Sequence, residues 1–284
     1  MPTDDLIATQ GGNLLLGKLL EQTNLEDRIN LLQRTFFPPP FDIPTIDVVK
    51  AYIGTLAQAQ PAFEAIEQFR YDPYFQRTLN IDIVPSCSTV RQRLDMIGEI
   101  AKAEMNVLIM QESCNLLRTM GTQVTPCFAD YVPLDVDVSP FDNSRTKKEG
   151  IGFTYKKVFG YAPIIAYLGQ EGFCVNVELR EGTQHCQKNT PEFLEIAIKN
   201  AKLATDAKIL VRLDSGNDSS DNMALFQRLG VDFIIKRNPR QEDIEAHFHK
   251  AVESGIEIPG SREGKRIFVY ESAKKPKGCS KDVR

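Results

Sequence analysis

Two aspartates in apolar, strand-like segments are the residues most able to do chemistry. The stretch VRLDSGNDS (211–219) places Asp214 directly after an apolar run and before Ser215 and Gly216. Upstream, the segment DYVPLDVDVSP alternates, so that its valines and leucine face one way while Asp135 and Asp137 face the other. A carboxylate at a strand end either caps the next element or is held out as a ligand.

Asp137 and Asp214 would form a metal site if their strands were neighbours. Close carboxylates repel one another unless a cation lies between them. Hard divalent ions such as Mg²⁺ take carboxylate oxygens as ligands and assist phosphoryl transfer. Asp137 and Asp214 are therefore candidate catalytic and metal-binding residues. The alternative is a turn or cap role for Asp214 and a solvated strand face for the other two acids.

The surrounding elements predict an α/β fold that could bring these residues together. Between about residues 130 and 237 the patterns indicate the order β-β-β-α-β-α-β, with GQEG as a hairpin turn and a helix over 190–204. Such an order suits a mixed sheet flanked by helices, in which the fourth strand commonly lies beside the first. Asp137 and Asp214 would then meet at one edge.

Residues 1–125 predict a separate helical domain. Apolar residues recur at three- and four-residue intervals, and FFPPPFDIP interrupts them because proline removes a donor and fixes φ. In PSCSTVRQRLD, a capped helix bearing Arg91 and Arg93 follows a proline-containing turn, as in a helix-turn-helix. We predict these two arginines as DNA contacts; two ordinary packed helices are the alternative. Residues 126–240 form the predicted sheet domain, and 241–284 the start of a β-rich insertion or a tail.

Composition narrows the class of protein. The net charge of −4 argues against wholesale coating of a polyanion, so nucleic-acid binding would have to be local. The basic clusters that could bind nucleic acid locally are in the second half of the chain. Its candidate DNA contacts are Arg145, Lys147, Lys148, Lys236 and Arg237. Six scattered cysteines without a Cys-x-x-Cys pair indicate reduced thiols, and no apolar run approaches the about 18 residues that span a bilayer. We expect a cytoplasmic protein.

Three segments together resemble bacterial insertion-sequence transposases of the DDE class. They are PLDVDVSPFDNSRTKKEG, GYAPIIAYLGQEGFCVNVELREGTQHCQKNTPEFL and VRLDSGNDSSDN with VDFIIKRN, and PSCSTVRQRLD resembles the region before them. The resemblance covers most of residues 70–240. It implies an RNase H-like fold, Mg²⁺ or Mn²⁺ as cofactor, and Asp137 and Asp214 as the first two family acids, catalytic and metal-binding, with Asp135 as the reserve for Asp137. It also implies that DNA is the partner, as element terminal inverted repeats and target DNA, with association with the nucleoid and a homodimer as further expectations.

The chain departs from the family pattern at the third acid. That acid is a glutamate on a helix after a β-rich insertion, with Tyr, Arg and Lys at helical spacing, and nothing in the sequence matches it. Glu271, in VYES, follows an apolar strand and has the wrong surroundings. We therefore expect the N-terminal portion of a longer transposase, incomplete at its C-terminus, with little activity alone.

Three functions are compatible with these residues. The leading hypothesis is a DDE transposase that cleaves phosphodiesters and transfers DNA strands with a metal ion. The alternative is a non-catalytic, DNA-binding remnant of a mobile element. A carboxylate-pair hydrolase acting on sugars would also need two close acids, but a chain without tryptophan has few rings to stack on sugars.

Overall fold

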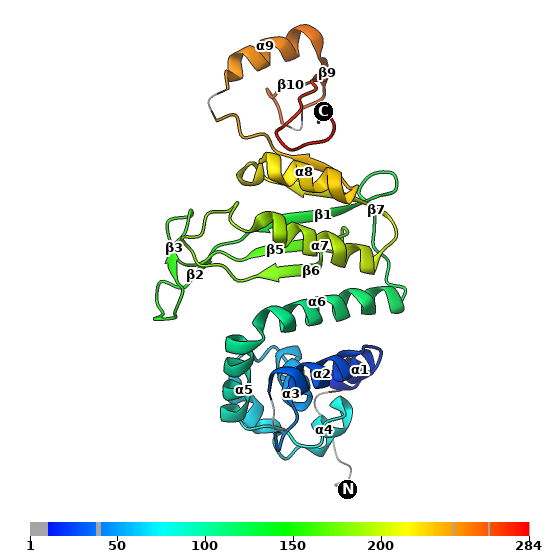
Figure 1. Cartoon of the computed structure of the whole chain (residues 1–284), viewed down its shortest axis with the longest axis vertical. Coiled ribbons are helices and arrows are strands. Elements are labelled where there is room, and N and C mark those ends of the chain that lie inside the picture. The colour runs from blue at the N-terminus through cyan, green and yellow to red at the C-terminus, as the bar shows by residue number, and fades with distance from the viewer. Residues whose placement is uncertain (1–10, 38–40, 241, 261, 284) are drawn as a thin grey trace. The chain divides into compact units, whose positions relative to one another are not determined.

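The chain forms two compact units, Met1–Thr122 and Gln123–Arg284, and each is described by itself. Figure 1 shows the computed structural model, which describes residues 11–37, 41–240, 242–260 and 262–283. None of the helices in these ranges is long and apolar enough to cross a membrane.

The first unit is helical, as predicted. Its elements are α1 (Gly12–Leu20), α2 (Leu25–Phe36), α3 (Thr45–Ala57), the 3₁₀ helix η1 (Phe63–Phe69), α4 (Pro73–Leu79), α5 (Cys87–Ile100) and α6 (Lys102–Thr119). Helix α5 begins where the sequence predicted a cap, because the Ser86 hydroxyl accepts a hydrogen bond from the Thr89 amide at 3.2 Å. Helix α4 precedes this cap, so a short helix, a turn and a capped helix follow one another in the predicted order.

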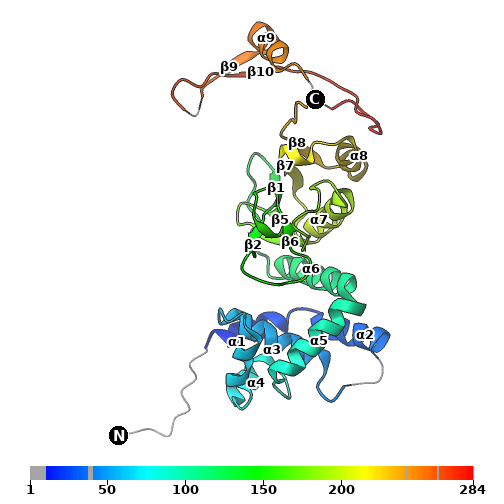
Figure 2. The ribbon, with the colours of Figure 1, turned by 90° about the vertical axis from the view of Figure 1, so that its left-hand side faces the viewer.

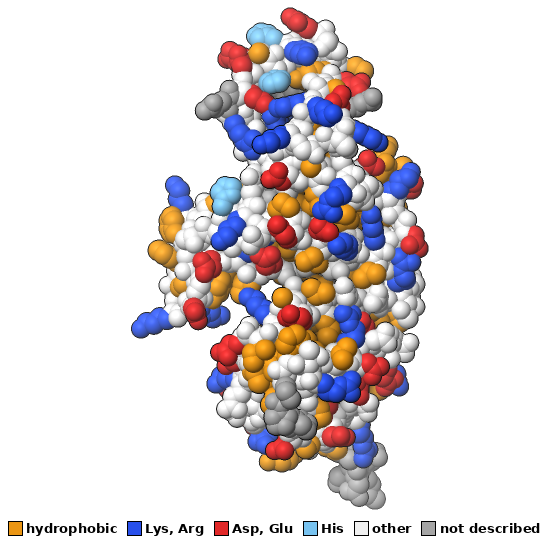
Figure 3. Space-filling view, viewed as in Figure 1, with side chains coloured by type: hydrophobic (Ala, Val, Ile, Leu, Met, Phe, Trp, Pro, Cys, Tyr) orange, Lys and Arg blue, Asp and Glu red, His pale blue; other side chains and the backbone are white. Residues whose placement is uncertain are grey.

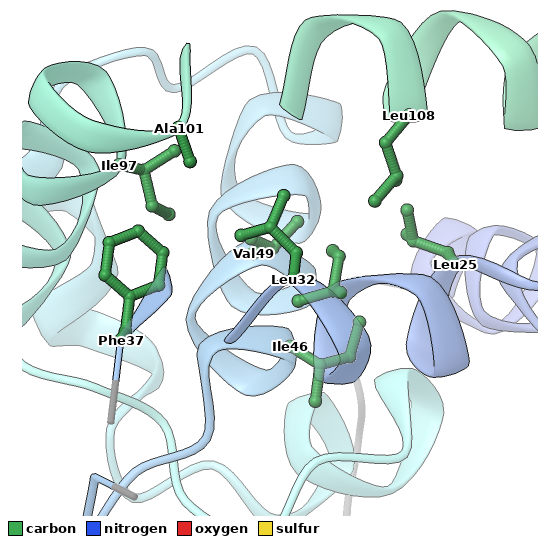
Figure 4. Packing of buried hydrophobic residues seen from close by; sticks show 9 residues of the cluster. Leu25, Leu32, Phe37, Ile46, Val49, Ile97, Ala101 and Leu108 are labelled. Atoms are coloured by element: carbon green, nitrogen blue, oxygen red, sulfur yellow. The ribbon is translucent and has the colours of Figure 1, made fainter. Parts of the chain in front are cut away.

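Two clusters of apolar side chains hold this unit together. In the first, Leu25 and Leu32 of α2 meet Ile46 and Val49 of α3 and Leu108 of α6, as Figure 4 shows. The second lies among α3, η1 and α4, where the rings of Phe69 and Phe75 stack with centroids 4.4 Å apart. Apolar stripes at helical spacing are therefore core faces here.

The second unit is built on a five-stranded mixed sheet in the order β6-β5-β1-β7-β8. Its strands are β1 (Tyr131–Val138), β5 (Ile164–Leu168), β6 (Phe173–Glu178), β7 (Lys208–Leu213) and β8 (Asp232–Ile235). Strands β1, β5 and β6 pair antiparallel, whereas β7 pairs parallel with both β1 and β8. For this sheet and its helices, the predicted order and the neighbouring placement of the first and fourth strands are confirmed, and the sheet is RNase H-like as expected.

Helices α7 (Thr190–Ala204) and α8 (Ser220–Leu229) cover one face of this sheet, on the same side of it in both ribbon views (Figures 1 and 2). Leu134 and Val136 of β1, with Val211 and Leu213 of β7, are buried on that face. Because side chains alternate along a strand, the residues between them project from the opposite face. On β1 the residues on that opposite face include Asp135 and Asp137.

Two further groups of elements complete the unit. A small three-stranded sheet, β2-β4-β3, lies between β1 and β5 in the sequence, with β2 at Phe141–Asp142, β3 at Gly152–Phe153 and β4 at Phe159–Tyr161. Helix α9 (Ile244–Ser254) and the strand pair β9 (Ile256–Ile258) and β10 (Ile267–Val269) follow β8. The sequence patterns did not predict the small sheet.

Candidate active site

The pairing of β1 with β7 makes Asp137 and Asp214 neighbours. Val136 lies opposite Leu213 in the parallel register, so Asp137 and Asp214 are the next residues along the two strands. Both side chains are exposed, and both project from the face opposite α7 and α8, because Val136 and Leu213 are buried on the helix side. Two carboxylates that are 77 positions apart in the sequence thus share one sheet edge.

Asp135 is on the same face, but its charge is already neutralised. Its two carboxylate oxygens accept hydrogen bonds from Arg212 Nε and Nη2, both at 2.5 Å, in a bidentate ion pair across β1 and β7. In the described part of the chain, Asp137 has no cationic partner; its Oδ1 accepts only from the Val138 amide, at 2.8 Å. This difference favours Asp137 over Asp135 as the residue available for a metal.

The turn after β7 holds the Asp214 carboxylate in place. Its Oδ1 accepts hydrogen bonds from the Gly216 amide at 3.1 Å and from Asn217 Nδ2 at 3.0 Å. Ser219, not Asp214, caps α8, since its hydroxyl accepts from the Asn222 amide at 3.3 Å. Oδ1 of Asp214 therefore stabilises the turn, which is part of the alternative role considered for this residue. The other oxygen, Oδ2, accepts no hydrogen bond from a described residue.

Two residues outside the predicted site lie beside the carboxylate pair. The Tyr155 hydroxyl donates to the Val138 carbonyl at 3.0 Å, and burial together with the charges of Asp137, Asp214 and Cys186 raises the pKa of this phenol. The Cys186 thiol donates to the Gly216 carbonyl at 3.1 Å, and burial and the charge of Asp214 raise its pKa. Only long-range folding places them there, so spacing in the sequence had no means of revealing them.

Gly216 lies in a crowded position. A Cβ at position 216 would lie 3.2 Å from Cys186 Sγ and 3.3 Å from Asp214 Oδ1, tighter than an ordinary contact. A side chain at position 216 would therefore crowd the protein's own thiol and carboxylate.

The predicted DNA contacts in this unit have different surroundings. Arg145, Lys147 and Lys148 are exposed in the loop between β2 and β3, and Lys236 is exposed just after β8. Arg237 is committed to ion pairs: its Nη1 lies 2.9 Å from Oδ2 of the buried Asp218, and it also pairs with Glu242. Arg237 thus anchors the segment after β8, which weakens its case as a DNA contact.

The two arginines of α5 also differ. Arg91 is half-exposed and forms an ion pair with Glu64. Arg93 is only 6% exposed; its Nη1 donates to the Ile43 carbonyl at 3.2 Å and to Thr45 Oγ1 at 2.9 Å, and its guanidinium lies over the Phe41 ring. The prediction of Arg93 as a DNA contact is wrong, because a guanidinium buried against its own unit cannot reach a phosphate.

The donor set of the carboxylate pair fits a hard divalent cation, although it is small. Exposed carboxylates without a cationic partner are the ligands that Mg²⁺ and Mn²⁺ prefer. Among the described residues, no group of three or more His, Cys, Asp or Glu side chains could hold a metal. Glu271 lies after β10 and belongs to no such group.

Comparison with known proteins bears on what this site does. A family model described as transposase DDE domain group 1 matches residues 5–272. No curated protein is significantly similar to the chain.

Three solved structures are similar to the chain at low identity. The piggyBac transposase synaptic complex with hairpin DNA, solved by cryo-EM, is 12% identical with a TM-score of 0.40, over 95% of this chain and 63% of that one. The Drosophila P element transposase strand transfer complex is 11% identical with a TM-score of 0.29, over 90% and 53%. The Mos1 transposase paired-end complex with the left transposon end is 11% identical with a TM-score of 0.26, over 87% and 85%. The chain thus covers less than two thirds of the first two proteins, and scores this low support no residue assignment.

Proposed function

The chain belongs to the family of transposase DDE domains, group 1, and from this premise we propose that Asp137 and Asp214 are carboxylates of a catalytic site acting on DNA. The observation that carries the proposal is the parallel register of β1 and β7, which makes neighbours of two exposed acids, neither of which pairs with a cation among the described residues. Asp135 shares their face but forms an ion pair with Arg212, which supports the choice of Asp137.

The proposed cofactor is Mg²⁺ or Mn²⁺, held by Asp137 and Asp214. A divalent ion there would offset the repulsion of the two carboxylates, favour attack on a phosphodiester and stabilise charge on the leaving oxygen. The chain's own contribution is positional: Gly216 and Asn217 fix the Asp214 carboxylate through Oδ1, while Oδ2 stays available. Arg145, Lys147 and Lys148 are the proposed phosphate contacts.

DNA nicking by the purified chain tests this proposal. Supercoiled plasmid is incubated with the chain and Mn²⁺ or Mg²⁺, with a chelator as the blank. Nicking that needs the metal is expected, and Asp137→Asn and Asp214→Asn should each abolish it. Asp135→Asn is the matched control, because it removes a carboxylate from the same strand and face and should retain nicking.

A second measurement separates metal binding from turnover. Mn²⁺ binding followed by electron paramagnetic resonance should be weakened by Asp137→Asn and by Asp214→Asn but not by Asp135→Asn. If Asp135→Asn instead removed both binding and nicking, the assignment of Asp137 would fail.

The second candidate is a DNA-binding protein without strand cleavage. The observation that favours it is the lack, among the described residues, of a third acid close enough to complete a metal cluster. DNA binding without metal-dependent nicking would support this function. A homodimer and association with the nucleoid remain predictions.

A further inference from the structure

The small sheet β2-β4-β3 has one face made of aromatic side chains. Phe141 pairs with Tyr161 and Phe153 pairs with Phe159, so each pair shares a face. Positions 159 and 161 are two apart on β4, which places all four rings on the same face. Phe141, Phe153 and Phe159 are each just over half exposed, and the rings of Phe153 and Phe159 meet with centroids 5.3 Å apart.

The other face of this sheet is closed by backbone. Gly152 and Gly160 are cross-strand partners, and Gly182 lies so close that a Cβ on it would be 2.3 Å from the Gly152 carbonyl oxygen and 2.4 Å from that of Gly160. A Cβ on Gly152 would lie 2.7 Å from Thr183 Cγ2. The sheet is therefore fixed by its glycine face, and its aromatic face is left to the outside.

The same sheet reaches the carboxylate pair. Strand β2 begins directly after β1, and the turn between β3 and β4 carries Tyr155, whose hydroxyl donates to the Val138 carbonyl next to Asp137. The charges of Asp137 and Asp214 both act on this phenol. The small sheet is thus joined to the end of β1 that carries Asp137.

The charge around the aromatic face is positive. Residues 141–161 contain five cations and two carboxylates, Asp142 and Glu149. All five cations are exposed and, in the described part of the chain, none is in an ion pair; they are Arg145, Lys147, Lys148, Lys156 and Lys157. Figure 3 shows blue basic and orange apolar side chains together at the left edge of this unit, over the small sheet. In a chain of net charge −4, this is a local positive patch.

We propose that the aromatic face of the small sheet binds unpaired bases of the DNA strand that enters the carboxylate pair, while the five cations hold its phosphates. Exposed rings interleaved with cations are what single-stranded nucleic acid requires, since bases stack on the rings whatever their sequence. This inference rests on the proposed function, because it takes DNA as the substrate. It adds that the bases of the bound strand are unpaired where the strand lies next to the carboxylate pair.

Binding of two DNA probes by the full-length chain tests the inference in a chelating buffer, so that no cleavage intervenes. One probe is a blunt duplex; the other is the same duplex with a short 3′ single-stranded tail containing 2-aminopurine. The chain should prefer the tailed probe and quench 2-aminopurine emission by stacking. The double variants Phe153→Ala/Phe159→Ala and Phe153→Leu/Phe159→Leu should lose about tenfold in affinity for the tailed probe and little for the blunt one.

The two double variants distinguish stacking from plain apolar contact. Leucine keeps an apolar surface but has no ring, so a Leu variant that keeps the preference for the tail would overturn the proposal. Phe128→Ala is the control, because Phe128 is 75% exposed in the same unit but lies outside the small sheet. Unchanged thermal unfolding of all three variants would show that folding is preserved.

The remaining outcomes are also decisive. If the wild-type chain bound both probes equally, the aromatic face would not recognise unpaired bases, although the proposed function would stand. If it bound neither probe, the proposed function would fail as well. If the Phe variants turned a dimer into a monomer without changing tail preference, the aromatic face would belong to an interface between copies.

Discussion

Arg91 and Arg93 lie two residues apart on α5, but one is a surface residue and the other a core residue. Arg93 donates to the Ile43 carbonyl and Thr45 Oγ1 and is 6% exposed, whereas Arg91 is half-exposed beside Glu64. Arg93→Ala should lower the free energy of unfolding by about 2–4 kcal/mol, because it leaves buried acceptors unpaired and opens a void. Arg91→Ala should change it by less than about 0.5 kcal/mol, as an exposed ion pair contributes little. Urea unfolding of both variants measures the contrast; equal losses would contradict the buried role of Arg93.

A similar contrast between neighbouring residues, Asp135 and Asp137, supports the proposed site. Sequence alternation put Asp135 and Asp137 on one face but could not separate them, since both are equally placed to meet a metal. The distinguishing fact is Arg212, which faces Asp135 across β7 in the parallel register. A pairing between residues 77 positions apart has no signature in local spacing.

At the scale of elements, Glu195 links the two helices that cover the sheet. It lies on α7 and forms ion pairs with Lys199 of α7 and Arg228 of α8, each at 2.8 Å. Hydrogen bonds from Arg228 and then Lys199 lower the pKa of the Glu195 carboxyl from 4.5 to about 2.

The sign of the pH dependence follows from that lowered pKa. A carboxyl whose pKa falls on folding stabilises the protein above its unfolded-state value of 4.5, and this stabilisation is lost as the pH drops toward about 2. Glu195→Gln should therefore lower the melting temperature at pH 7, and the difference from wild type should vanish near pH 2. Added salt should shrink it at pH 7, because the group is at the surface. Glu192→Gln, on the same helix, is the control; an unchanged difference between pH 7 and pH 2 would refute the linkage.

Two glycines in helices show how crossing elements constrain the first unit. A Cβ at Gly17 of α1 would lie 1.7 Å from the Thr78 carbonyl oxygen of α4, whereas a Cβ at Gly98 of α5 would meet nothing within 4 Å. Gly17→Ala should therefore destabilise the chain by about 1–3 kcal/mol, because the helices must separate. Gly98→Ala should stabilise it by about 0.5–1 kcal/mol through helix propensity. Thermal unfolding of the two variants checks both signs, and a stabilising Gly17→Ala would show that α1 and α4 do not pack this closely.

Elements whose period and caps are local were predictable, and those set by distant contacts were not. The alternation in 131–138, the GQEG hairpin between β5 and β6 and the Ser86 cap of α5 follow from neighbouring residues. The small sheet was missed because its strands have two or three residues and depend on Gly182 packing against Gly152 and Gly160. Tyr155 reaches the carboxylate pair through that sheet, so it was missed with it.

At the scale of the whole molecule, the net charge of −4 means that the proposed binding of DNA would have to use local patches. Arg145, Lys147 and Lys148 lie in one exposed loop, and in the described part of the chain none has an ion-pair partner. Each phosphate contact releases counterions, so the logarithm of the binding constant falls with the logarithm of salt concentration by about 0.9 per contact.

Replacing these three residues with glutamine should therefore weaken duplex binding and flatten its salt dependence. The slope should fall by up to about 2.7 if each residue contacts one phosphate, as measured by fluorescence anisotropy across a salt series. Lys250→Gln/Lys265→Gln/Lys281→Gln is the matched control, because it removes the same charge from three exposed residues elsewhere in this unit. If both triple variants lost the same affinity, DNA binding would depend on the total charge of the chain. The loop would then have no special role in binding.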